Sequence, residues 1–204
     1  MNKVMCRKIL ILSLATVILL AFSGCGKKSD VSKLDKSSVQ VNKDGSVVST
    51  MIEDFSESYY SVDELREMTE NEVNAFVVKN GEGAAELKSV DAESGKIKMV
   101  MNFGNSDNFS DFNSETFIYE TVADAKLNGH IETGLLVDAD GNPIESDKAS
   151  ELSDEHIVVT AMKNIVAAPY KIKYVSRGVK IIDNYLADLS EIADDSRACI
   201  VLSK

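Results

Sequence analysis

Tryptophan is absent from this chain of 204 residues, and proline, histidine and cysteine are scarce, with two, two and three residues. With two prolines and 11 glycines, the composition excludes a collagen-like or low-complexity chain, and its 44 % hydrophobic content is that of a globular protein. Without tryptophan the chain lacks the best surface for stacking on sugar rings, which argues against a carboxylate pair for glycoside hydrolysis.

Positive charge is also in short supply. The chain has 22 basic against 33 acidic side chains, which gives a formal net charge of −11. Phosphate binding needs a basic face, so this balance excludes nucleic acid as an expected partner.

The first 25 residues carry the strongest signal in the sequence. Lys3, Arg7 and Lys8 form a positive start, and an almost unbroken apolar run follows over residues 9–22. That run is shorter than the roughly 20 residues that a transmembrane helix needs. A positive start, a short apolar core and small residues after it are typical of an export signal.

The end of this segment, Ala21-Phe22-Ser23-Gly24-Cys25, resembles the lipobox of bacterial lipoproteins. The resemblance implies that Cys25 is acylated, that a peptidase cuts just before it, and that lipid on Cys25 anchors the protein to the extracytoplasmic face of the cell membrane. Phe22 departs from the family pattern, which usually has leucine there. An uncleaved anchor and an ordinary secretory signal with a chance cysteine are the alternatives.

Processing would remove three basic side chains and no acidic one, so that 180 residues remain and the charge falls from −11 to −14. Residues 25–38 contain four lysines and no aromatic residue, and we expect a flexible tether there. Its lysines either touch anionic headgroups or belong to a solvated spacer. Residues 39–204 then form a single globular domain.

The pattern of this domain predicts an α+β fold. Ser61 and Glu64 form a capping box, and we expect the helix that follows to end at Asn80-Gly81. Apolar and polar side chains alternate over residues 96–104, which indicates a strand with one buried face. We further expect a hairpin over 39–52, a helix from Ser106, a strand over 116–120, a capped helix that ends at 128–129, and strands over 157–162, 164–167, 170–175, 179–182 and 198–202.

These elements predict a mostly antiparallel sheet with one or two covering helices. The domain is similar to small lipoproteins of Gram-positive bacteria that have no assigned activity, and this similarity implies no activity for the present chain. After processing and acylation Cys199 would be the one free thiol, so no internal disulfide could form. Its apolar surroundings, residues 198–202, predict a buried, unreactive thiol.

Asp138, Asp140 and Asn142 are candidate metal ligands, because they alternate like the first oxygen ligands of a calcium loop. An EF-hand loop, however, needs glycine at its sixth position and glutamate at its twelfth, where this chain has Pro143 and Ala149. The same residue types favour a hairpin turn, and we expect a turn between two short strands here. We expect no metal and no cofactor.

His130 and His156 are the two histidines, far apart in sequence and without partners at metal-ligand spacing. The leading hypothesis is an exported, membrane-anchored lipoprotein whose non-catalytic body binds a protein, a cell-wall component or a small molecule. The alternative is a surface hydrolase whose site is assembled from dispersed Ser, His and Asp residues, with one of these histidines as the base. A pocket that gathers a histidine and a carboxylate would favour the hydrolase, and a flat or apolar patch the binding module.

Overall fold

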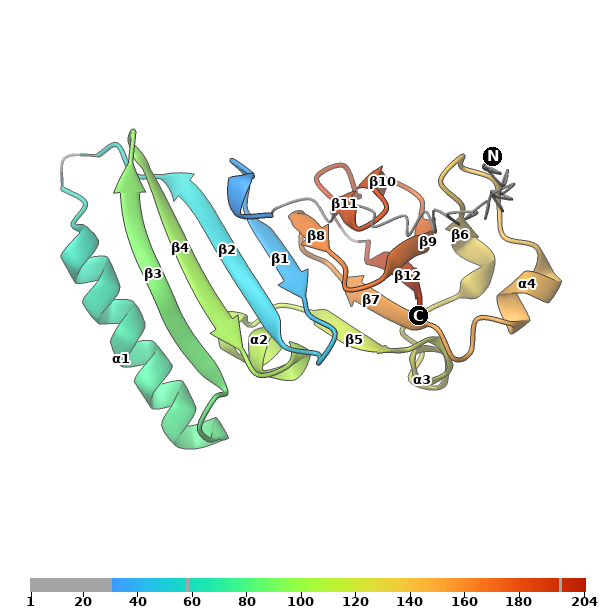
Figure 1. The fold of residues 1–204 in the computed structure, drawn as a ribbon, viewed down its shortest axis with the longest axis horizontal. Coiled ribbons are helices and arrows are strands. Elements are labelled where there is room, and N and C mark those ends of the chain that lie inside the picture. The colour runs from blue at the N-terminus through green and yellow to red at the C-terminus, as the bar shows by residue number, and fades with distance from the viewer. Residues whose placement is uncertain (1–30, 58, 195) are drawn as a thin grey trace, which may run out of the picture.

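The computed structural model describes residues 31–57, 59–194 and 196–204, so Cys25 and the signal segment lie outside the described residues. Two β-sheets and four α-helices make up the described part of the chain (Figure 1). Of the strand pairs, β1 and β8 run parallel and the others run antiparallel. The predicted α+β class is confirmed.

The larger sheet has the spatial order β10-β11-β8-β1-β2-β4-β3. Its strands are, in chain order, β1 (Ser38–Val41), β2 (Val47–Asp54), β3 (Ala85–Glu93), β4 (Lys96–Phe103), β8 (Ile165–Ala167), β10 (Lys180–Asp183) and β11 (Leu186–Asp188). The sheet thus joins the first half of the domain to segments from its last quarter, and β1–β8 is the junction.

The smaller sheet has the order β5-β7-β12-β9-β6. Its strands are β5 (Phe117–Thr121), β6 (Leu136–Val137), β7 (His156–Thr160), β9 (Lys171–Ser176) and β12 (Ala198–Ser203). The helices are α1 (Val62–Asn80), α2 (Ser106–Asn113), α3 (Val122–Leu127) and α4 (Ser146–Ser150), with short 3-10 turns at η1 (Val31–Lys33) and η2 (Thr133–Leu135).

Local signals in the sequence account for several of these boundaries. The Ser61 hydroxyl accepts a hydrogen bond from the Glu64 backbone N–H and begins α1, and Gly81, at φ 99°, ends it. The Thr121 hydroxyl caps α3 in the same way through the Asp124 N–H. The predicted hairpin, both capped helices and the strand over 96–104 are confirmed within a residue or two.

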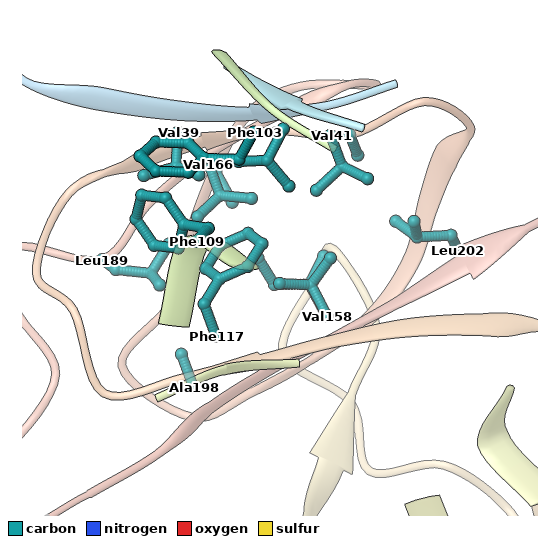
Figure 2. Packing of buried hydrophobic residues seen from close by; sticks show 14 of the residues in the cluster. Val39, Val41, Phe103, Phe109, Phe117, Val158, Val166, Leu189, Ala198 and Leu202 are labelled. Carbon is teal, nitrogen blue, oxygen red and sulfur yellow. The ribbon is translucent and has the colours of Figure 1, made fainter. Parts of the chain in front are cut away.

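The main core lies between the two sheets, where α2 inserts Phe109 (Figure 2). The Phe109 ring lies 5.2 Å, centroid to centroid, from both Phe103 of β4 and Phe117 of β5, in edge-on geometry. Val39 and Val41 approach from one sheet, and Val158 and Leu202 from the other. This aromatic contact therefore joins the sheets.

The central strands of the smaller sheet are buried on both faces. Val158 and Ile200 face the main core, whereas Ile157, Cys199 and Val201 face a second cluster under α3. Continuous apolar runs in β7 and β12 are the expected result of double burial.

Two expectations need correction. We expected one sheet, but the strands divide into two, and each sheet buries one face against the other in the main core, while a second cluster covers the other face of the smaller sheet. The predicted tether also extends too far along the chain. Val31 is buried, and Leu34 packs beside it on β8 and β11. The Ser37 hydroxyl donates a hydrogen bond to the Ile52 carbonyl and accepts one from the Ile52 backbone N–H.

Replacing Phe109 by alanine should lower the free energy of unfolding by about 3–5 kcal/mol, because the ring is fully buried and leaves a cavity between the sheets. Urea denaturation of the purified protein measures the change. Leu127→Ala, at an 85 % exposed position of α3, is the control and should change stability by no more than about 0.5 kcal/mol. A loss below about 1 kcal/mol for Phe109→Ala would contradict the central role of this contact.

Candidate functional site

A hollow lies between the C-terminal half of α1 and the start of β3, and we call it the α1–β3 groove. Its volume is about 530 Å³, within the range of roughly 300–1,000 Å³ usual for ligand pockets. Apolar side chains from both elements form its floor, namely Val73, Val77, Ala85 and Leu87. Glu70, Glu82 and Glu86 line it as carboxylates.

Helix α1 is held to the larger sheet by polar contacts in its first half, and in its second half the Phe76 ring packs on Phe112 of α2, with centroids 5.3 Å apart. The Arg66 guanidinium donates a 2.7 Å hydrogen bond to the Val90 carbonyl, and Thr69 is buried with its hydroxyl 3.6 Å from the Met99 sulfur. Beyond this point the buried stripe of α1 continues to Val73, while the turn at residues 81–84 leads back into β3. The helix therefore flanks the outermost strand of the larger sheet (Figure 1).

A second hollow, of about 190 Å³, contains His130, and we call it the His130 pocket. His130 Nδ1–H donates a 2.7 Å hydrogen bond to Glu120 Oε1, and Asn128 donates to the other oxygen of that carboxylate at 3.1 Å. The carboxylate thus fixes the ring orientation. This is the histidine–carboxylate arrangement that a hydrolase would use.

Two possible nucleophiles line the same pocket, Ser176 and Cys199. The Ser176 hydroxyl accepts a 2.9 Å hydrogen bond from the Cys199 backbone N–H, so it is tied to β12. Burial raises the pKa of the Cys199 thiol to about 11, with a small opposing effect of Arg197. A thiol with this pKa stays protonated near neutral pH and is a weak nucleophile. The prediction of a buried thiol is confirmed.

The structure does not bring the two histidines together. His156 contacts the rings of Tyr119 and Tyr170, with centroids 5.1 and 6.0 Å away. Tyr119 and Glu120 are neighbours on β5, so their side chains point to opposite faces of the sheet. Burial lowers the pKa of His156, and the Lys204 charge adds to this effect. Its Nδ1 is buried without a hydrogen-bond partner among the described residues.

Asp138, Asp140 and Asn142 form a hydrogen-bonded turn. Asp138 Oδ1 accepts from the backbone N–H groups of Asp140 and Asn142, each at 2.9 Å, and these bonds lower the pKa of Asp138. The predicted pair of short strands reduces to β6 and a single bridge between Val137 and Pro143. Arg177 and Lys180 line the hollow beside this turn, a charge pattern that does not suit a cation.

No group of three or more His, Cys, Asp or Glu side chains in the described ranges is arranged to hold a metal ion. No helix within those ranges is long and apolar enough to cross a membrane. Comparison with known proteins found no match among family models, curated proteins or solved structures.

The sequence did not single out the α1–β3 groove. One wall is the helix expected after Ser61, and the other is strand β3, for which the sequence shows no clear pattern. No motif joins the two. A signal was nevertheless present, since an acidic helix with an apolar stripe is followed by Gly81-Glu82-Gly83. The groove fits a ligand better than the His130 pocket does, because it is larger and combines apolar side chains with carboxylates.

Iodoacetamide should alkylate Cys199 slowly in the folded protein at pH 7.5 and faster in 8 M urea. A pKa about two units above the ordinary thiol value leaves about 100-fold less thiolate at this pH. The rate in the folded protein should rise until the pH approaches 11. Mass spectrometry of the peptide that contains Cys199 gives the rate, and rapid alkylation of the folded protein at pH 7.5 would contradict a protonated, buried thiol.

Proposed function

We propose that this chain is an exported lipoprotein, anchored through an acylated Cys25 to the extracytoplasmic face of the cell membrane. Its body acts as a non-catalytic binding module, and its ligand lies in the α1–β3 groove. The observation that carries the binding role is the groove itself, a hollow of about 530 Å³ with an apolar floor and carboxylates along its walls.

The anchor rests on the sequence of the first 25 residues. A positive start, an apolar run and the segment Ala21-Phe22-Ser23-Gly24-Cys25 occur in the order that export and lipidation require. The packing of Val31 and Leu34 on the body is compatible with an anchor just before them, because it puts the start of the described chain on the surface of the larger sheet.

Hydrolysis in the His130 pocket is the second candidate function, favoured by the bond between His130 and Glu120. The binding module is the better supported of the two. Ser176 accepts a backbone hydrogen bond and the Cys199 thiol is held protonated, so neither possible nucleophile is prepared for attack. Rapid alkylation of Cys199 at neutral pH would reverse this preference.

Replacing Cys25 by alanine should abolish both lipid attachment and cleavage, because the thiol accepts the lipid before the peptidase acts. Cells expressing the variant with a labelled fatty acid should yield an unlabelled precursor of full length. Cys6→Ala, in the positively charged start of the leader, is the matched control and should be labelled and cut like the original chain. Normal labelling and cutting of the Cys25→Ala protein would refute the anchor.

Filling the groove should remove ligand binding without unfolding the protein. Soluble wall fragments and a mixed hexapeptide library are tested as probes by thermal unfolding. A bound probe at 100 times its Kd adds about 2.7 kcal/mol, or roughly 5–10 °C in Tm. Asn74 lines the groove, so Asn74→Trp should cancel the shift.

Asn71→Trp is the matched control, since Asn71 is an exposed asparagine of α1 outside the groove lining, and this variant should keep the shift. A probe that stabilises the Asn74→Trp variant as much as the original chain would place binding elsewhere. The absence of any shift with either class of probe would refute the groove as a site for these ligands.

A further inference from the structure

We propose that the α1–β3 groove binds an extended peptide that carries lysine or arginine side chains, and that this peptide pairs as an added strand with the free edge of β3. The inference rests on the proposed binding function and names its partner class. Three properties of the groove carry it, namely an unpaired strand edge, an apolar floor and an excess of carboxylates.

β3 is the outermost strand of the larger sheet and pairs on one side with β4. The Gly104 backbone N–H donates to the Ala84 carbonyl at 3.3 Å, so Ala84 and Gly104 form a hydrogen-bonded pair, and this shows which residues of β3 bond β4. Because alternate residues of an antiparallel strand bond the partner, Glu86 bonds β4, and the backbone groups of Ala85 and Leu87 point to the free edge.

Helix α1 closes this edge farther along the strand. The Arg66 guanidinium satisfies the outward carbonyl of Val90, which is a common way to protect an edge strand. The register shifts between Leu87 and Ser89, and the groove ends on this side of the shift. The accessible part of the edge is therefore the start of β3, and this part forms one wall of the groove.

The floor and the charges define the peptide. Side chains alternate along a strand, so one face of an added peptide would rest on Val73, Val77 and Leu87. Glu70 and Glu82 are exposed and form no ion pair with other described residues, whereas Glu86 pairs with Lys88 at 3.0 Å. An apolar peptide with interspersed basic side chains complements this wall.

The same charges disfavour two other occupants. An anionic polymer would meet three carboxylates in the groove. A second copy of this chain, paired edge to edge at β3, would bring Glu82 and Glu86 of both copies together, and like charges on adjacent strands destabilise pairing. A basic peptide from another protein is the occupant that the wall attracts.

The test uses the full chain in phosphatidylcholine nanodiscs, which carry no net charge, and the probe acetyl-(Val-Lys)3-amide. Calorimetry gives its affinity, and hydrogen exchange of residues 82–88 reports pairing at the edge. We expect binding and slower exchange of this segment, because the outward N–H groups of Ala85 and Leu87 gain partners. Acetyl-(Val-Glu)3-amide and a (Val-Lys)3 peptide N-methylated at alternate residues should bind at least tenfold more weakly.

Two variants test the charges. The double variant Glu70→Gln/Glu82→Gln should bind the probe about three- to tenfold more weakly, the effect of two exposed ion pairs. Glu72→Gln/Glu151→Gln removes the same charge from exposed sites outside the groove and should bind within twofold of the original chain. Equal affinity in both double variants would overturn recognition by charge.

The remaining outcomes separate this inference from the proposed function. Binding that leaves the exchange of residues 82–88 unchanged, or equal binding of the N-methylated probe, would overturn strand pairing. If the basic probe fails to bind while wall fragments still raise Tm in a way that Asn74→Trp cancels, the groove binds ligands but not this peptide class. If neither probe acts through the groove, both the inference and the proposed function fail.

Discussion

The contact of Phe109 with Phe103 and Phe117 is the constraint on which the rest of this structure depends. It joins a ring from each sheet to one from the short helix between them, and it lies in the middle of the main core. Chain segments from both halves of the domain meet around it, because β1 pairs with β8 across 120 or more residues. The α1–β3 groove lies at the margin of this core, because Val73 and Ala85 belong to both, whereas the His130 pocket lies against the second cluster.

The groove and the His130 pocket illustrate two ways to create a hollow. The groove forms where an amphipathic helix flanks the outermost strand of the larger sheet, one edge of which has no strand partner. The His130 pocket forms where a turn after α3 crosses the outer face of the smaller sheet, with its histidine held by Glu120. The first leaves the backbone groups of Ala85 and Leu87 without a strand partner, whereas in the second the His130 ring and the Ser176 hydroxyl are hydrogen-bonded within the chain. An open binding surface is the natural use of the first.

Much of the fold could be predicted from the sequence because its signals are local. Ser61 and Thr121 mark the starts of α1 and α3, and the alternation of apolar and polar side chains in residues 96–104 predicts β4. Strand β3 was not predicted, because Lys88 lies at a register irregularity and breaks the alternation of apolar and polar residues. Strand β11 was not predicted, because three residues are too few to show a pattern. The division into two sheets depends on long-range pairing, for which no local residue pattern is diagnostic.

The candidate sites were less predictable for the same reason. His130 was singled out as a residue, but its partner Glu120 is supplied by the fold, ten residues away on a different element. The carboxylates of the groove come from α1, from the turn after it and from β3, and no local pattern joins them. Asp138 is predicted as a turn residue from local residue types, and its hydrogen bonds account for the oxygen-rich side chains at this turn.

The packing of Val31 and Leu34 limits how far this molecule can reach. Only residues 26–30 separate Val31 from Cys25, so if Cys25 carries the lipid that we propose, the body begins at most about 20 Å from it. Four strand spacings, together about 19 Å, separate β8 from β3. Under that proposal the groove would stay close to the bilayer surface, and its ligand would have to be reached there.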